Sequence, residues 1–549
     1  MDQSKKSFIK NGIFMVLFFD ILVSIFAPIE FYITNKAYFF FSGKELLPFA
    51  FILFFVFLIG GSVFVFLLSF LNQKISAPII ALLMGITTAL YIIGNFMVVN
   101  YGAMDGLIPR WERFKKEGII QTATAIAIPV IFVLIAILIK NREKVMKGFG
   151  TLALCLSGVL IFTLISIMIT TGIDKDPEYI ITRKGEFDLS KEQNVIVFIL
   201  DTYDSKLMDD MLKADHDKYA KMLSDFTYYP DTSSMYAATE LALPHIITGI
   251  SYHNEQTYGD YLKYAFNNSK LLDYLSDNDY STGLFTICRM PQEESSLRFD
   301  NVQYIKRTVS SHRRLEGYMY KFLGFRYMPQ PLKKYFWFYP DEMRSEIESS
   351  TDESVVLYGD NNYDFDSSLS GINTSNEKKA FRLYHIDGVH PPFSISADFS
   401  PSGSVTSIEE EAYGIMYVVD HLLTSLKENG IYDNSAIVIM ADHGYFDERS
   451  NPLFMVKGVG ESHPLEISDK PLSYDYLQDV LINLCEGKDS KDAVASDLSE
   501  INGRHYYFYS WNKDMKDYAY ANTITEYMIP GNVRDTDSYE EINVYETPE

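Results

Sequence analysis

Cysteine is scarce in this chain. The three cysteines in 549 residues, Cys155, Cys288 and Cys485, exclude a disulfide framework and a four-cysteine zinc site. Positive charge is also in short supply, because 48 Lys and Arg face 72 Asp and Glu. The resulting net charge of −24 argues against nucleic-acid binding, which needs a basic surface. No internal repeat or low-complexity tract is evident. With 47% hydrophobic residues, the chain is too apolar for a disordered protein.

The charge is divided unevenly along the chain. Residues 1–172 contain 14 Lys and Arg and 8 Asp and Glu, a net charge of +6. The remaining 377 residues contain 34 Lys and Arg and 64 Asp and Glu, a net charge of −30. This division predicts a membrane-embedded N-terminal part joined to an acidic soluble part.

Five apolar stretches in the N-terminal part have the length of membrane-spanning helices. Four contain no charged residue: 46–71, 75–99, 119–139 and 149–173. The fifth, about 13–32, contains Asp20 and Glu30, and it is too long and too charged for a signal peptide. A hydrocarbon layer about 30 Å thick needs ~20 helical residues. We therefore predict five transmembrane helices.

Flanking positive charge predicts the orientation of these helices. Eight Lys and Arg lie on the side of the N-terminus, and six lie on the other side. Because positive residues favour the cytoplasmic side, this bias places the N-terminus in the cytoplasm. After five crossings, the soluble part would lie outside the cell. The expected location is the cell membrane, with a multi-pass anchor and an extracellular catalytic domain.

The soluble part has the pattern of an α/β domain. Continuous apolar runs of strand length occur at 195–200, 283–287, 380–385 and 436–440. Such runs are typical of strands buried on both faces of a parallel sheet. An amphipathic helix is expected at 407–429, ending at Asn429 and Gly430, which form a C-cap signal. Alternating strands and helices predict a mainly parallel sheet covered by helices.

The C-terminal tail is aromatic and rich in strand-forming residues. Segments 504–511, 525–529 and 541–545 predict a small antiparallel β element. It would cover an edge of the main sheet or line the cleft, and simple edge cover is the simpler interpretation.

Metal-ligand residues follow three of the predicted strands. Asp201 ends the first strand, His385 and His390 lie at the end of another, and Asp442-His443-Gly444 follows a third. Ligands of such sheets bind at the carboxyl ends of the strands. Carboxylate and imidazole together favour Zn²⁺ or Mn²⁺ over Mg²⁺. Each residue alone is a weak signal, because an Asp after a strand is often a turn or helix cap.

A fourth element begins at Thr239. Its hydroxyl would stand at the start of a helix, where the positive end of the helix dipole suits a phosphate oxygen. The alternative is that Thr239 only caps the helix, with Glu240 in the first turn.

These motifs together resemble the alkaline phosphatase/sulfatase superfamily. Five N-terminal spans before such a domain resemble lipoteichoic acid synthases and lipid A phosphoethanolamine transferases. The resemblance implies one divalent metal ion held by Asp201, Thr239, Asp442 and His443. It also implies that the Thr239 hydroxyl, deprotonated by the metal, forms a phospho-threonine intermediate. His390 matches the family's His that contacts the substrate phosphate or the departing oxygen.

Two further residues are possible substrate contacts. Asp204 would be a ligand by analogy with some phosphatases, but a helix cap is the simpler interpretation. His385 either touches the site or is a core residue at the end of its strand.

The sequence departs from the family in two places. Formylglycine sulfatases need Cys or Ser followed by x-Pro-x-Arg, whereas Thr239 is followed by Glu-Leu-Ala-Leu. This argues against sulfate-ester hydrolysis by that route. Phosphoethanolamine transferases also carry a His in the loop after Asp-His-Gly. Here that loop, 445–451, is short and has no His, which puts a second zinc in doubt.

The expected function is transfer of glycerol phosphate or ethanolamine phosphate from a membrane phospholipid to a cell-envelope glycan or lipid. The alternatives are an extracellular phosphatase, phosphodiesterase or sulfatase-like hydrolase of the same fold, and a non-catalytic membrane scaffold. The predicted domains are a transmembrane domain at 1–173, a linker at 174–193, a catalytic domain at 194–500 and a β-rich extension at 501–549.

Overall fold

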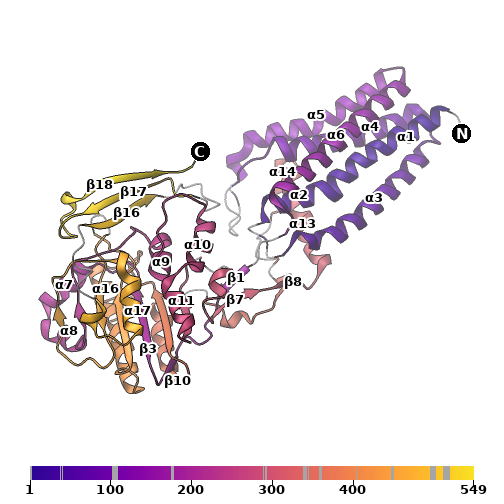
Figure 1. Ribbon diagram of the computed structural model, residues 1–549. Coiled ribbons are helices and arrows are strands. Elements are labelled where there is room, and N and C mark those ends of the chain that lie inside the picture. The colour runs from indigo at the N-terminus through magenta and orange to yellow at the C-terminus, as the bar shows by residue number, and fades with distance from the viewer. Residues whose placement is uncertain are drawn as a thin grey trace. The chain divides into compact units, whose positions relative to one another are not determined.

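Figure 1 shows the computed structural model of the chain. The polypeptide forms two compact units. The first unit consists of Met1–Asp176 and Lys306–Ser350, and the second consists of Pro177–Ile305 and Thr351–Glu549. The structure describes residues 3–36, 39, 41–101, 109, 111–174, 178–288, 290, 293–337, 343, 345–357, 362–402, 405–446, 450–494, 503–510 and 520–548.

Long apolar helices make up most of the first unit. They are α1 (Gln3–Asp20) continued by η1 (Ile21–Phe26) and α2 (Ala27–Thr34), α3 (Leu47–Leu68), α4 (Gln73–Phe96), α5 (Lys115–Leu138) and α6 (Arg142–Thr171). Five helical stretches in the described residues are long and apolar enough to cross a membrane, which confirms the predicted helices. The last begins at Arg142 rather than 149, because Asn141 caps a charged first turn.

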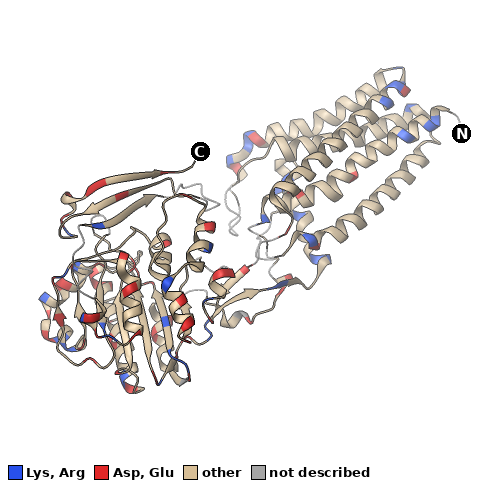
Figure 2. Cartoon of the chain, in the orientation of Figure 1, with Lys and Arg blue, Asp and Glu red and all other residues tan. Residues whose placement is uncertain are grey.

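The surface of these helices suits a bilayer. Only 11% of the apolar window of Gly43–Leu68 and 17% of that of Trp111–Leu138 are buried inside the protein. Figure 2 shows that Lys, Arg, Asp and Glu gather near the ends of the long helices and are rare along them. Outward-facing apolar side chains between charged ends indicate a membrane protein.

Residues 306–350 pack with this helical unit. They form β8 (Arg307–Val309), α13 (His312–Tyr327), α14 (Gln330–Lys333) and β9 (Ile347–Ser349). Arg326 on α13 pairs with Glu30 on α2 through two contacts, at 2.6 and 3.1 Å. The predicted 194–500 domain included this segment, whose packing against distant helices leaves no local sequence signal.

A seven-stranded sheet forms the core of the second unit. Its order is β14-β4-β13-β12-β3-β11-β6. The three central neighbours β12 (Ser435–Met440), β3 (Asn194–Leu200) and β11 (Ala380–Ile386) are parallel, as is β6 (Ser281–Phe285), and β13 (Phe454–Lys457) is antiparallel. Every residue of β3, β11 and β12 is buried, so helices must cover both faces. The predicted mainly parallel α/β fold is confirmed.

Helices and short strands complete this unit. The helices include α7 (Ser205–Ala214), α8 (His216–Met222), α9 (Thr239–Thr248), α10 (Tyr258–Asn267), α11 (Lys270–Asp277), α15 (Asn362–Ser368), α16 (Ile408–Glu428) and α17 (Leu477–Cys485). The short strands are β4 (Thr227–Tyr228), β5 (Thr232–Ser233) and β14 (Glu466–Ile467). Within the predicted linker, β1 (Glu178–Ile181) pairs with β7 (Val302–Ile305), and β2 (Asp188–Ser190) pairs with β10 (Asn373–Asn376).

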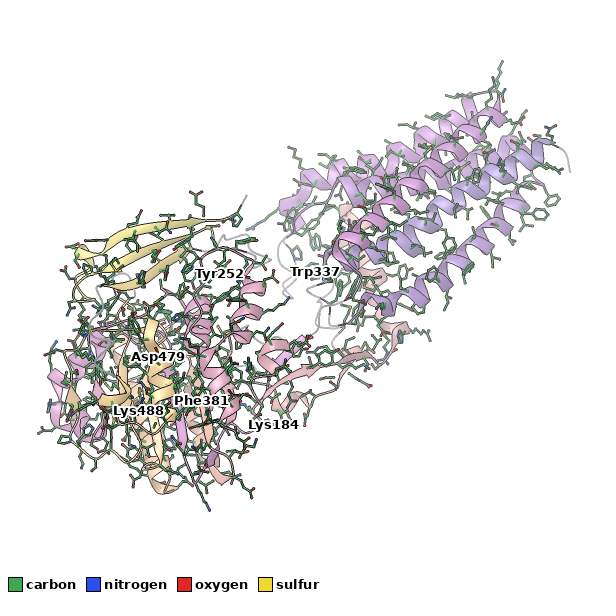
Figure 3. All side chains as sticks on the ribbon, viewed as in Figure 1. Lys184, Tyr252, Trp337, Phe381, Asp479 and Lys488 are labelled. Atoms are coloured by element: carbon green, nitrogen blue, oxygen red, sulfur yellow. The ribbon has the colours of Figure 1, made fainter. Side chains whose placement is uncertain are left out.

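The C-terminal element is a three-stranded antiparallel sheet, as predicted. It contains β16 (Arg504–Ser510), β17 (Thr523–Ile529) and β18 (Glu540–Glu546). Trp511, the last residue of the first predicted segment, lies outside the described residues. The amide of Tyr507 on β16 donates to the carbonyl of Met235 at 2.7 Å, so this sheet is joined to the segment that precedes α9. Tyr252, labelled in Figure 3, joins the same region, because its amide donates to the Tyr236 hydroxyl at 2.7 Å.

Candidate metal and nucleophile site

The register of the central strands brings the predicted ligands to one edge of the sheet. Ile199 of β3 lies opposite His385 of β11 and Met440 of β12. Asp201 and Asp442 therefore leave neighbouring strands at the same level. Asp201, Asp442 and His443 are buried, and one ligand atom from each lies within 4.8 Å of those of the other two.

Two backbone amides orient Asp442. Its Oδ1 accepts hydrogen bonds from the amides of Thr202 at 3.1 Å and His443 at 3.0 Å. Its Oδ2 is fully buried and has no hydrogen-bond partner among the described residues. Thr202 has a φ of 65°, a conformation that a β-branched residue rarely adopts. This strained turn aims the Thr202 amide at Asp442 and leaves one oxygen of Asp442 for another ligand.

The imidazole of His443 is oriented by its own loop. Its Nδ1 lies 2.7 Å from the carbonyl oxygen of Gly444. Because a carbonyl only accepts hydrogen bonds, Nδ1 carries the proton, and Nε2 of the neutral ring has a free lone pair. This Nε2 lies 3.6 Å from Asp442 Oδ2 and 3.9 Å from Asp201 Oδ1.

These three side chains fit a divalent cation. Separations of 3.6 and 3.9 Å are too long for hydrogen bonds. Two ligands held at about 2.0 to 2.2 Å by one tetrahedral ion would lie about 3.3 to 3.6 Å apart. An unpartnered carboxylate oxygen and an imidazole lone pair facing the same space are suited to Zn²⁺ or Mn²⁺.

Thr239 meets this group from the first turn of α9. Its Oγ1 donates to Asp201 Oδ2 at 3.3 Å. The N-cap of α9 is Ala238, which supplies no side-chain cap, so Thr239 occupies the first helical position. The alternative interpretation of Thr239 as a helix cap therefore does not describe this geometry. Its hydroxyl stands at the helix start, where backbone amides and the helix dipole favour an oxyanion.

The turn after β11 packs closely on Asp201. Gly388 has a φ of 55°, and a Cβ atom added to it would lie 2.4 Å from the Asp201 amide nitrogen. The side chain of Asn362 holds Gly388 through two hydrogen bonds of 2.9 Å, one to its amide and one to its carbonyl. The amide of Val389 also donates to the Asp201 carbonyl at 3.0 Å. These contacts fix the backbone from which the Asp201 carboxylate projects.

The remaining predicted residues occupy different places. His390 is exposed in the turn after β11, where its amide donates to the Asp387 carbonyl at 2.9 Å. Asp204 caps α7 through Oδ1, and its Oδ2 accepts from the amides of Tyr445 at 3.0 Å and Phe446 at 3.3 Å. Both oxygens of Asp204 are therefore used within the fold. His385 is buried with its Nε2 3.5 Å from Asp201 Oδ2.

The local charges determine the ionisation of the site. Burial alone would raise the pKa of Asp201, but the imidazoles of His385 and His443 and a hydrogen bond from Thr202 lower it to about 2. Burial likewise opposes protonation of His385, and the carboxylates of Asp201 and Asp442 outweigh it and raise the pKa of His385. Asp201 is thus available as an anionic ligand across the physiological pH range.

Sequence reasoning missed a contact from the C-terminal sheet. The Tyr509 hydroxyl on β16 donates to the Ala238 carbonyl at 2.9 Å and accepts from the Leu241 amide at 3.2 Å. It clamps the first turn of α9, which carries Thr239. No local pattern signals this contact, because about 270 residues separate Tyr509 from α9. The C-terminal sheet thus does more than cover an edge.

Comparison with known families finds a match for the part of the chain that holds the site. Residues 193–453 match the sulfatase family model. The chain carries a sulfatase-family domain. This match spans β3, α9, β11 and β12, and it therefore covers every residue of the site described above except Tyr509. It confirms the predicted superfamily and the prediction that the protein is an enzyme.

Solved structures of sulfatase-like enzymes are remotely similar to the chain. A putative sulfatase from Bacteroides fragilis is 12% identical over 65% of this chain and 89% of its own, with a TM-score of 0.36. A phosphonate monoester hydrolase from Silicibacter pomeroyi is 11% identical over 62% and 85%, with a TM-score of 0.34. A protein of the alkaline phosphatase superfamily from Vibrio parahaemolyticus is 10% identical over 67% and 85%, with a TM-score of 0.35. No curated protein matches the chain.

Proposed function

We propose that this sulfatase-family enzyme is a membrane-anchored, metal-dependent phosphotransferase. It would take glycerol phosphate or ethanolamine phosphate from a membrane phospholipid and place it on a cell-envelope glycan or lipid. The observation that carries the proposal is the position of Thr239, whose hydroxyl lies at a helix start and 3.3 Å from a carboxylate of the metal-ligand group.

The chemistry would run in two displacements at phosphorus. Thr239 Oγ1 forms a bond to the phosphorus of the donor, and the bond to the diacylglycerol oxygen breaks. An acceptor hydroxyl then attacks the same phosphorus and releases Thr239. A divalent cation bound here would supply a lower pKa for the Thr239 hydroxyl and compensation for charge on the phosphoryl oxygens.

This chain's own residues would prepare each step. The hydrogen bond to Asp201 orients Oγ1, and the first-turn amides of α9 other than that of Leu241 would face the phosphoryl oxygens. His390 is exposed in the turn after β11, and it would donate a proton to the departing oxygen. The missing x-Pro-x-Arg after Thr239 supports phosphoryl rather than sulfuryl chemistry.

The helical unit supports a lipid donor. Five candidate spans are more than an anchor requires, and their apolar surfaces suit a bilayer. We place the N-terminus in the cytoplasm and the enzyme domain outside the cell, because positive residues are more numerous on the N-terminal side.

The second candidate is a hydrolase of the same fold, a phosphatase or phosphodiesterase that uses water as the acceptor. The sulfatase family match favours it as much as the transferase, because both reactions use the same residues. A non-catalytic scaffold is disfavoured, since Asp201, Thr239, Asp442 and His443 are all present and gathered.

The experiment is label transfer in proteoliposomes containing phospholipid labelled in its headgroup and an envelope-lipid extract. The full chain is compared with Thr239→Val, which removes the hydroxyl at constant shape, and with Thr239→Ser, which keeps it. We expect label on Thr239 and on the extract for the full chain, partial activity for Ser, and none for Val. Label only in free alcohol phosphate would favour the hydrolase. Equal turnover by the Val variant would remove the mechanism.

A further inference from the structure

The imidazole of His385 lies beside the group formed by Asp201, Asp442 and His443, and its Nε2 makes no hydrogen bond to the described residues. The residue is 3% exposed, and this nitrogen has no hydrogen-bond partner among the described residues. It lies 3.5 Å from Asp201 Oδ2 and 4.0 Å from Asp442 Oδ2. Asp442 Oδ2 is also buried and without such a partner. Two buried polar atoms therefore face each other at a distance that no hydrogen bond spans.

The other ring nitrogen of His385 is held in place. Its Nδ1 lies 2.9 Å from the hydroxyl of Thr286, just beyond the end of β6. The Thr286 hydroxyl also accepts from the amide of Cys288 at 3.1 Å, which fixes the position of its oxygen. A hydroxyl oxygen can accept from Nδ1, and the ring then presents a lone pair at Nε2 toward the carboxylates. This arrangement is typical of metal-binding histidines, in which the ring nitrogen that does not bind the metal is hydrogen-bonded to a fixed partner.

We propose that His385 is a direct ligand of the same cation, through Nε2, beside Asp201, Asp442 and His443. The proposal rests on the metal dependence in the proposed function. Nε2 of His385 lies 3.5 Å from Asp201 Oδ2 and 4.0 Å from Asp442 Oδ2, a range similar to the 3.9 and 3.6 Å that separate Nε2 of His443 from Asp201 Oδ1 and Asp442 Oδ2. Both imidazoles thus face Asp442 Oδ2, and each faces a different oxygen of Asp201.

A second imidazole ligand changes the metal that the site selects. With two nitrogen and two carboxylate donors, the site would favour Zn²⁺ over Mg²⁺, which prefers oxygen ligands. The Thr239 hydroxyl would then be a fifth donor. The family resemblance implies no metal role for His385. With His385 as a ligand, the metal site of this chain would have one donor more than the set that the resemblance implies.

The experiment counts imidazoles on bound zinc in the full-length protein by X-ray absorption. We expect two imidazoles at about 2.0 to 2.1 Å in the wild-type chain and one in His385→Asn. The matched control is His421→Asn, a histidine of the same unit whose ring instead pairs with Asp366 at 2.7 Å. This control should retain both imidazoles. In chelator competition, the zinc Kd should rise by about 100-fold or more for His385→Asn and stay constant for His421→Asn.

The outcomes separate this inference from the proposed function. One imidazole in the wild-type chain, or two in His385→Asn, would overturn the assignment of His385 and leave the metal-dependent mechanism intact. His385 would then be a hydrogen-bonding partner of Asp201 or of the substrate. A wild-type chain that binds neither zinc nor manganese would overturn both. Because the wild-type measurement needs no variant, misfolding of His385→Asn cannot obscure the result.

Discussion

Gly388 offers a steric test of how the turn after β11 controls the metal site. In Gly388→Ala, the new Cβ would lie 2.4 Å from the Asp201 nitrogen, 2.5 Å from its carbonyl oxygen and 2.6 Å from the Leu200 carbonyl carbon. All three are backbone atoms of the segment that presents the Asp201 carboxylate. The residue also has a φ of 55°, which costs an L-residue about 1 to 2 kcal/mol. Overpacking adds about 1 to 3 kcal/mol.

Gly430→Ala is the matched control for this substitution. Gly430 has a φ of 69°, but a Cβ there would meet no atom within 4 Å. This variant should lose about 1 to 2 kcal/mol of unfolding free energy, against about 2 to 5 kcal/mol for Gly388→Ala. Only Gly388→Ala should also weaken metal binding, because relief of the overlap must move Asp201.

Denaturant unfolding and chelator competition on the two variants measure these effects. Equal losses of stability would mean that the turn adapts and that the close approach of Gly388 has no structural consequence. Unchanged metal affinity in a clearly destabilised Gly388→Ala would show that the Asp201 carboxylate does not depend on this turn.

Three further predictions concern other parts of the second unit. Tyr509→Phe should lower kcat about tenfold with little change in metal affinity, because the clamp on α9 is lost while the ligands stay; unchanged kcat would contradict this. Burial lowers the pKa of Lys457 from 10.5 to about 8 in the folded protein. Between these two pH values, Lys457 is protonated in the unfolded chain but neutral in the folded one. The free energy of unfolding should therefore rise with pH over this range. Lys457→Met should lack that rise in pH-dependent denaturation. Zinc at a free concentration of 100 Kd should stabilise the domain by about 2.7 kcal/mol in the same assay, and an unaltered midpoint after chelation would argue against the cation.

The sequence predicts those parts of the fold whose signal is local. The strands β3, β11 and β12 are continuous apolar runs, and α16 has a clear amphipathic period ending at Asn429 and Gly430. Parallel strands then place their following residues at one edge, which is why Asp201, Asp442 and His443 could be expected together.

The parts that escaped prediction depend on remote partners. Strands β1 and β2 have four and three residues, and they exist because β7 and β10 lie beside them. The positive φ of Thr202 could not be predicted from the sequence, because β-branched residues such as Thr rarely adopt that conformation. Thr286 and Tyr509 are brought to the site by the tertiary fold. Their contacts with His385 and Ala238 therefore could not be predicted from residue spacing along the chain.

The clamp between Tyr509 and α9 joins two parts of the chain that are synthesised at different times. The proposed metal donors all lie before residue 444, but the hydroxyl that holds α9 is added some 270 positions after that helix. A chain still emerging from the ribosome, or one cut before β16, could assemble its ion-binding pocket and yet hold its reactive threonine loosely. The first turn of α9 would then be fixed only when the final strands are in place.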